Sequence, residues 1–344
     1  MIDRIGDPVL KAITFIAAAL AVTVLVLIAY ELIKGSRLAF RHFGLGFLTS
    51  QVWDDIHGQF GALSLIFGTV VTAVLAILIA APLAIAIALF LTELAPKPVR
   101  ALLGALVEML ASIPSVVLGL WGILVLGPFV KNQLEPLLGS ALGFLPFFRG
   151  AHSTSGILTA VLILTIMVVP IIASVTRELF TTVPPELREG ALALGATRWE
   201  MVRGVLLPAA RPGILAAVAR GFGRAVGEAI AVAMVIGGQI GIHWSLFAFG
   251  DTLAAQNALQ YNGADTNLQI SSLVYLAAIL LVISLAVNIG AQLLIRPIDL
   301  RPRRQRIALD RALEAEGVSA DRWPSPSSRY ARAVAFAAAR WSTD

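Results

Sequence analysis

The 344-residue chain contains no cysteine and few charged side chains, and both shortages restrict what the protein can be. Without cysteine there is no disulfide, no thiol nucleophile and no cysteine-ligated metal. Charged residues make up 14% of the chain and hydrophobic residues 58%, and the mean hydropathy is +0.85. A soluble chain of this length rarely has so few charges. The composition therefore indicates a membrane protein.

Sequence patterns that accompany enzymatic chemistry are also missing. The chain has no Gly-x-x-x-x-Gly-Lys-Ser/Thr phosphate loop and no serine nucleophile elbow. Its closest approach to a dinucleotide fingerprint, Gly221-x-Gly223 with Gly227, has the third glycine one residue late and no preceding strand. We therefore expect no catalytic activity and no cofactor. We expect no metal either, because the histidines lack metal-ligand spacing: they are His42, His57, His152 and His243.

Six apolar runs reach the roughly 20 residues that a bilayer-crossing helix needs. The first is followed by Tyr30-Glu31-Leu32-Ile33-Lys34 and not by a small-residue cleavage site, which favours a retained helix over a signal peptide. The predicted fold class is all-α, a polytopic membrane protein with about six transmembrane helices. The predicted spans are 12–33, 62–91, 102–128, 156–176, 213–240 and 271–295.

The net charge of +5 comes largely from basic residues beside the spans, where the orientation rule for membrane proteins explains them without nucleic acid. Their distribution places both termini in the cytoplasm. The cluster of Lys34, Arg37 and Arg41 argues locally for the opposite orientation. The cytoplasmic set is Arg4, Lys11, Lys97, Arg100, Arg177, Arg188, Arg198, Arg203, Arg211, Arg296, Arg301, Arg303, Arg304 and Arg306.

A polar interval between the fourth and fifth spans has the pattern of a helix, a turn and a second helix. Pro184 and Pro185 suit the first turn of a helix, and Gly195 offers a left-handed stop. Thr197-Arg198-Trp199-Glu200 is a capping box that starts the second helix, and Pro208 is expected to end or kink it.

The first helix of this interval has an apolar side but is too short to span a bilayer. Leu187, Ala191 and Leu194 share one face. A short, capped, half-apolar helix at a membrane surface is suited to docking on a partner. The structural alternative is an ordinary capped turn.

The third and fifth spans contain residues that lipid does not favour. Pro114 interrupts the third span, which predicts either a packing kink or a kink that lines a path. In the fifth span Arg220, Arg224 and Glu228 are spaced by four and are predicted to form one stripe on a helix face. Each would cost roughly 2.5–3.5 kcal/mol at the bilayer centre, so they are expected to face the bundle or water. The alternative is a structural Arg224–Glu228 ion pair, with Arg220 at the interface.

The polar interval resembles the EAA loop of ABC importer permeases. In those proteins the loop has Glu-Ala-Ala, three residues, Gly, nine residues, Ile, one residue and Leu-Pro. Gly190 here replaces an alanine and Val205 an isoleucine. The resemblance implies a type I ABC importer permease fold, in which this helix couples the chain to a separate ATPase subunit. The residues it assigns to coupling are Glu189, Ala191, Gly195, Leu207 and Pro208.

Three further stretches resemble the phosphate-specific branch of these permeases, in particular its C-type subunit. The first, Gly223-Arg224-Ala225-Val226-Gly227-Glu228, resembles its Gly-Arg-Ala-x-Gly-Glu motif. The others are Phe60-Gly61-Ala62-Leu63 with Gly68-Thr69, and Ile113-Pro114-Ser115-Val116-Val117 with Gly119-Leu120-Trp121-Gly122. The resemblance implies phosphate import across the inner membrane of a prokaryote, with Arg224, Glu228 and Arg220 on the substrate pathway. The implied partners are a second permease subunit, two ATP-binding subunits and an extracytoplasmic phosphate-binding protein.

Arg224 can offset the charge of an anion, and Glu228 can accept a hydrogen bond from the hydroxyl that phosphate still carries near neutral pH. Sulfate has no such proton. The alternatives are a permease for another oxyanion or for phosphonate, an ATPase-independent secondary transporter or channel, and a membrane enzyme.

The expected domains follow from these features. Residues 1–60 form the first transmembrane helix and an outer loop, and 61–300 form the core permease domain with the coupling loop near 184–212. Residues 301–344 form a basic cytoplasmic tail that is predicted to be disordered. Its arginines and aromatics at 329–341 leave open an interfacial helix on membrane lipid.

Overall fold

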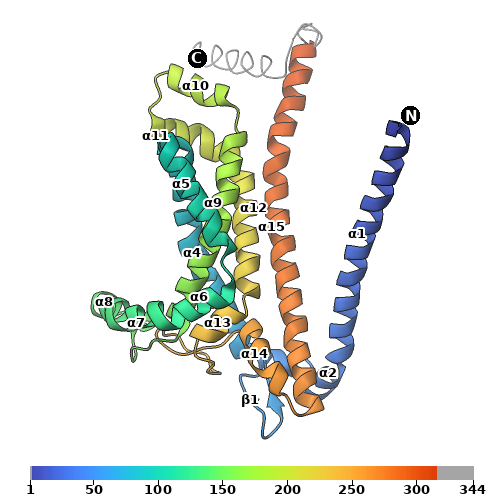
Figure 1. The fold of residues 1–344 in the computed structure, drawn as a ribbon, viewed down its shortest axis with the longest axis vertical. Coiled ribbons are helices and arrows are strands. Elements are labelled where there is room, and N and C mark those ends of the chain that lie inside the picture. Colours follow the sequence, from blue (N-terminus) through green and yellow to red (C-terminus); the bar gives the residue numbers. More distant parts are fainter. Residues whose placement is uncertain (1, 316–344) are drawn as a thin grey trace. The chain divides into compact units, whose positions relative to one another are not determined.

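The computed structural model describes residues 2–315, and most of them are helical (Figure 1). They divide into two compact units, one ending at Ile289 and one beginning at Gly290. The elements of the first part of the chain are α1 (Ile2–Gly35), α2 (Arg37–Phe43), α3 (Gly46–Thr49), β1 (Trp53–Asp54), β2 (Gln59–Phe60), α4 (Leu63–Leu89), α5 (Lys97–Ser112), α6 (Ser115–Trp121), α7 (Gly127–Phe129) and α8 (Glu135–Leu142).

The remaining elements complete the bundle and carry the polar interval identified above. They are α9 (Ile157–Thr182), α10 (Pro185–Ala193), α11 (Arg198–Met201), α12 (Leu207–Gly227), α13 (Ile230–Val235), α14 (Leu253–Gln260) and α15 (Asn267–Ala315). Short π-helical segments lie at Phe90–Leu94, Gly122–Leu126, Val130–Leu134 and Val202–Leu206, and 3₁₀ turns at Pro146–Phe148 and Tyr261–Gly263.

Six helical stretches among the described residues are long and apolar enough to cross a membrane, as the sequence predicted. The strands β1 and β2 form one short antiparallel hairpin. The prediction of an all-α polytopic fold is confirmed. The six stretches are Val9–Gly35, Leu63–Leu94, Ser115–Leu142, Ile157–Thr182, Arg198–Gly227 and Asn267–Leu293.

Helix α9 is the centre of the bundle and packs against α4, α5 and α12. Fully buried alanines recur every three or four residues along α4 and give it one smooth face. Small side chains let two backbones approach closely, and the Thr165 hydroxyl of α9 donates to the Ala76 carbonyl of α4 at 3.4 Å. The alanines are Ala73, Ala76, Ala80 and Ala84.

A second hydrophobic cluster lies at the end of the bundle that carries α14. The Phe47 and Tyr275 rings stack with centroids 4.6 Å apart. The Ser271 hydroxyl donates to the Gly35 carbonyl at 2.7 Å and accepts from the Ala39 amide at 3.0 Å. These contacts join the end of α1 and the start of α2 to the first turns of α15.

A third cluster lies at the opposite end, which carries α10 and α11. Phe180 of α9 and Leu206, just before α12, are fully buried in it, together with Ala88 of α4. Leu187 of α10 packs against the same cluster. The ends of three core helices are therefore held together where α10 begins.

The third predicted span, 102–128, is wrong as one helix. α5 ends at Ser112, and the backbone is extended at Ile113 (ψ 128°) and Pro114 (ψ 138°) before α6 begins. A residue before proline is displaced from the helical region, and proline has no N–H to continue the ladder. The segment from α6 through α7 to α8 then runs in a different direction from that of α5 (Figure 1).

The fifth predicted span, 213–240, is shifted by about half its length. The helix starts at Arg198 and continues past Pro208 to Gly227, so of the two outcomes expected at Pro208, an end or a kink, the end is wrong. The π-helical segment Val202–Leu206 precedes the proline directly. A widened turn at this point accommodates the missing N–H and the bulk of the ring.

The disordered tail predicted from residue 301 differs from the structure over residues 301–315, where α15 continues to Ala315. This stretch is rich in arginine and alanine, which are strong helix formers. The rest of the predicted tail, 316–344, lies outside the described residues. The other domain boundaries remain predictions.

Candidate translocation site and coupling helix

Arg224 and Glu228 lie close together, but not on one helical stripe as predicted. α12 ends at Gly227, and Glu228 has an extended backbone with ψ 118°. The carboxylate nevertheless reaches back toward α12, with Glu228 Oε2 3.9 Å from Arg224 Nη2. The carboxylate is thus displaced from the stripe by the break that follows Gly227.

The Arg224 and Glu228 side chains differ in exposure, and this difference determines how each can contact a ligand. The Glu228 side chain is 9% exposed and Arg224 is 45% exposed. Glu228 Oε1 also accepts from the amide of Ala231 at 3.4 Å, at the start of α13. Arg220, one turn before Arg224, is exposed as well. The site therefore presents the Arg224 guanidinium beside a carboxylate that is held by the next helix, with a second exposed arginine one turn earlier on α12.

The glycines around these charges have different structural roles. A Cβ at Gly221 would meet Val168 and Ile172 of α9, so this glycine is required for close packing of α12 on α9. A Cβ at Gly227 would meet nothing within 4 Å. Gly227 is therefore not needed for packing, and it lies where α12 ends, directly before Glu228.

The phosphate-type motif around Pro114 and Gly119 is a packing site that supports this region. Gly119 of α6 lies against Ala231 and Met234 of α13, and a Cβ there would be tighter than van der Waals contact with both. The break at Pro114 therefore lets α6 support α13, the helix that Glu228 caps. Neither this motif nor the one with Gly68 and Thr69 contains a charged residue.

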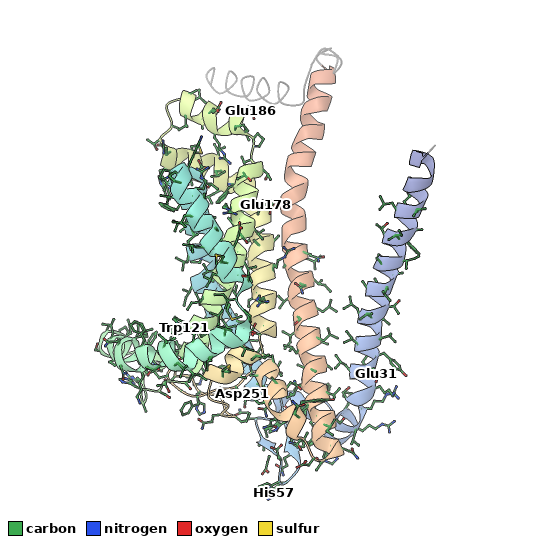
Figure 2. All side chains as sticks on the ribbon, in the orientation of Figure 1. Glu31, His57, Trp121, Glu178, Glu186 and Asp251 are labelled. Carbon is green, nitrogen blue, oxygen red and sulfur yellow. The ribbon has the colours of Figure 1, made fainter. Side chains whose placement is uncertain are left out.

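At the α14 end of the bundle, Gly68 and Thr69 of α4 hold the chain segment that leads into α14. Gly68 lies directly beneath the Asp251 backbone carbonyl, and the Thr69 hydroxyl accepts from the Leu253 amide at 2.9 Å. Burial raises the pKa of the Asp251 carboxyl to about 7, and the Thr252 amide, which donates to it at 2.7 Å, opposes the rise. Figure 2 shows Asp251 at the opposite end from Glu186 of α10.

The turn after α10 forms as the sequence predicted. Gly195 has φ +87°, in the left-handed region that favours glycine. The Gly195 amide donates to Leu192 O at 3.0 Å and the Ala196 amide to Ala191 O at 3.1 Å, which is a Schellman motif. The Thr197–Glu200 capping box is present in both directions, with Glu200 Oε2 2.8 Å from Thr197 N.

The predicted apolar face of α10 is divided between two uses. Leu187 and Ala191 pack inward against the third cluster, whereas Leu194 is 88% exposed. Glu189 is exposed on α10, and Trp199 of α11 is 65% exposed. Among the residues assigned to coupling, Ala191 thus supports the helix from inside, and Glu189 and Gly195 face outward.

The sequence analysis did not identify Trp199 as an exposed residue at the α10 end of the bundle, because the capping box explains only Thr197 and Glu200. Its signal was a large aromatic at the first turn of a helix in a polar interval. Leu207 is half-buried against the third cluster, and Pro208 is exposed. The structure therefore brings Leu207 and Ala191 together at one cluster and leaves Pro208 on the helix surface.

The structure combines a bundle of membrane-length helices with a short helix, α10, at one end of it. A family model for the binding-protein-dependent transport system inner membrane component matches residues 80–300. The chain belongs to this family of multi-pass membrane transport components.

Within that family, the chain is similar to proteins named phosphate transport system permease protein PstC. It is 43% identical to the protein of Mesorhizobium japonicum over 86% of this chain and 91% of that one. It is 41% identical to the protein of Haemophilus influenzae over 84% of this chain and 93% of that one. A solved structure of a bacterial alginate ABC transporter, with its periplasmic protein, matches 83% of this chain and 95% of its own with a TM-score of 0.54 and 18% identity. That likeness shows the fold.

Proposed function

We propose that this chain is the permease subunit of an ATP-driven importer and moves inorganic phosphate across the inner membrane of a prokaryote. The observation that carries the proposal is its similarity, over most of both chains, to proteins named as phosphate transport system permeases. The arrangement of Arg224 and Glu228 supports it. An exposed guanidinium can pair with the anion, and an adjacent carboxylate can accept the phosphate hydroxyl.

The proposal includes partner subunits that would supply the other functions of an importer. A second permease subunit would complete the path, two ATP-binding subunits would hydrolyse ATP, and a phosphate-binding protein would deliver the substrate outside. The exposed Leu194 and Trp199 beside Glu189 support docking of α10 and α11 on an ATP-binding subunit. Arg220, Arg224 and Glu228 would line the path between the two permease subunits.

Proteoliposomes containing the assembled permease and ATPase subunits test the proposal. With the binding protein outside and ATP inside, we expect uptake of labelled phosphate that excess sulfate does not inhibit. Uptake without the ATPase subunits would instead establish a secondary transporter or channel. Preferential uptake of a phosphonate or another oxyanion would assign the chain to that substrate.

The proposed orientation has both termini in the cytoplasm. Figure 1 places α10, α11 and the start of α5 at one end of the bundle and α2 and α14 at the other. Reporter fusions after residues 97, 198 and 300 should therefore read cytoplasmic, and fusions near 45, 140 and 257 external. An external reading at 198 would contradict the assignment, because an ATPase cannot dock there.

A further inference from the structure

Helix α10 is joined to the bundle by backbone that is not helical. α9 ends at Thr182, and Val183 and Pro184 are extended, with ψ of 124° and 131°. At its other end α10 stops at the left-handed turn of Gly195. The backbone alone therefore does not make α10 a rigid continuation of α9. A displacement of α10 could be taken up by backbone rotation at Val183–Pro184 and at the Gly195 turn.

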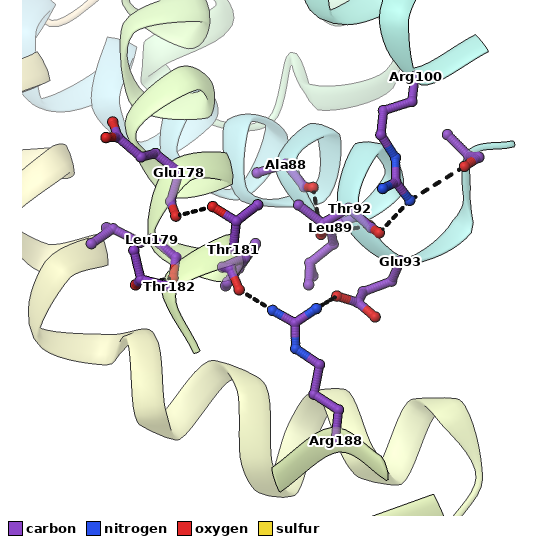
Figure 3. Close-up of polar contacts among 12 residues, drawn as sticks. Ala88, Leu89, Thr92, Glu93, Arg100, Glu178, Leu179, Thr181, Thr182 and Arg188 are labelled. Carbon is purple, nitrogen blue, oxygen red and sulfur yellow. Dashed lines mark hydrogen bonds and ion pairs between the residues drawn. The ribbon is translucent and has the colours of Figure 1, made fainter. Parts of the chain in front are cut away.

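One side chain bridges this gap. Arg188, in the middle of α10, has its Nη1 2.8 Å from Glu93 Oε1 in the π-helical segment that follows α4. Its Nη2 donates to the Phe180 carbonyl in the last turn of α9 (Figure 3). A single guanidinium thus contacts the terminal turns of two core helices.

The chemistry of the two Arg188 contacts favours a rigid connection between α10 and the ends of the core helices. Guanidinium presents its donors in a rigid planar fork, so two directions are fixed at once. The carbonyls of a last helical turn lack intrahelical partners and attract a cation. The Arg188 and Glu93 side chains are only 21% and 15% exposed, so water screens the pair less than it screens a surface pair.

The segment that carries Glu93 is itself held from the other side. Arg100 Nη2 of α5 donates to the Thr92 carbonyl at 2.6 Å (Figure 3). It also lies 3.5 Å from the Ala95 carbonyl. Arg188 therefore joins α10 to the ends of α4 and α9, and Arg100 joins the segment after α4 to α5.

We propose that Arg188 is a positioning residue for coupling, which carries a displacement of α10 into α4 and α9 through Glu93 and the Phe180 carbonyl. This inference rests on the proposed function, in which α10 docks on an ATP-binding subunit. Leu187 and Ala191 hold α10 against the bundle by apolar packing, which has no preferred direction. The guanidinium supplies the directional link.

The test compares Arg188→Gln, Glu93→Gln and their double variant in assembled complexes, and measures phosphate imported per ATP hydrolysed. Each single variant should lower this ratio by about fivefold or more, the lower range of measured coupling between sites. The double variant should resemble either single one, because the two residues act as a unit. Arg188→Lys should give an intermediate ratio, since an ammonium lacks the planar fork.

Lys97→Gln is the matched control, because Lys97 is an exposed cation at the first residue of α5, and it should leave the ratio unchanged. If the bridge only stabilises the fold, uptake and hydrolysis will fall together with the amount of complex, and the unchanged ratio will overturn the inference. A variant that does not assemble leaves Glu93→Gln and Arg188→Lys as independent tests. Absence of ATP-driven uptake in the wild-type complex would instead refute the proposed function.

Discussion

A complex carrying Arg224→Gln together with Glu228→Gln is expected to assemble normally and to import phosphate at least about tenfold more slowly than wild type. A hydrogen bond to a charged group contributes about 1.5–3 kcal/mol, and both groups that would hold the anion are neutralised. The side-chain amide introduced at position 228 can still accept from the Ala231 amide, as Glu228 does at 3.4 Å. The start of α13 should therefore be preserved. Uptake of labelled phosphate, normalised to assembled complex, measures the effect.

The two single variants separate transport from folding. Removing only one partner of a charged pair leaves the other charge uncompensated, so each single change can lower assembly as well as transport. If the pair is only structural, the double variant should recover both quantities, because two neutral amides can bond each other. Wild-type uptake in the assembled double variant would leave Arg224 and Glu228 no role in transport.

Gly195→Val is expected to uncouple ATP hydrolysis from phosphate import while leaving membrane insertion intact. Gly195 has φ +87°, and a β-branched residue there incurs backbone strain of about 1–3 kcal/mol. A Cβ would meet nothing within 4 Å, so the effect comes from the backbone and not from crowding. The Schellman turn should open and displace Leu194. Hydrolysis stimulated by the binding protein, together with phosphate uptake, measures the loss.

Gly190→Ala is the matched control for this variant. Gly190 lies on α10 just before the Gly195 turn, a side chain there enters open space, and its φ is not positive. The substitution also restores the alanine that the EAA pattern has at this position. We expect wild-type coupling for it. Normal coupling in Gly195→Val as well would refute docking at this turn.

Local patterns predicted the features that depend on neighbours within about four residues. The Thr197–Glu200 capping box and the left-handed Gly195 are short-range hydrogen-bonded structures, and both form as expected. The apolar runs also predicted six membrane-length helices, because each must satisfy its own backbone in lipid. The proline rules were less decisive. Pro114 breaks the chain, whereas Pro208 lies within a continuous helix, since a π-helical segment precedes it.

The sequence by itself therefore determined the class of protein, the number of membrane-length helices among the described residues, the left-handed end of α10 and the capping box of α11. Only the tertiary structure decided that Glu228 leaves the stripe of Arg224 to cap α13, that half of the apolar face of α10 is used internally, and that Arg188 reaches Glu93. Arg188 and Glu93 are 95 positions apart in the chain. No periodicity or spacing encodes such a contact, because it depends on how α4, α9 and α10 pack at one end of the bundle.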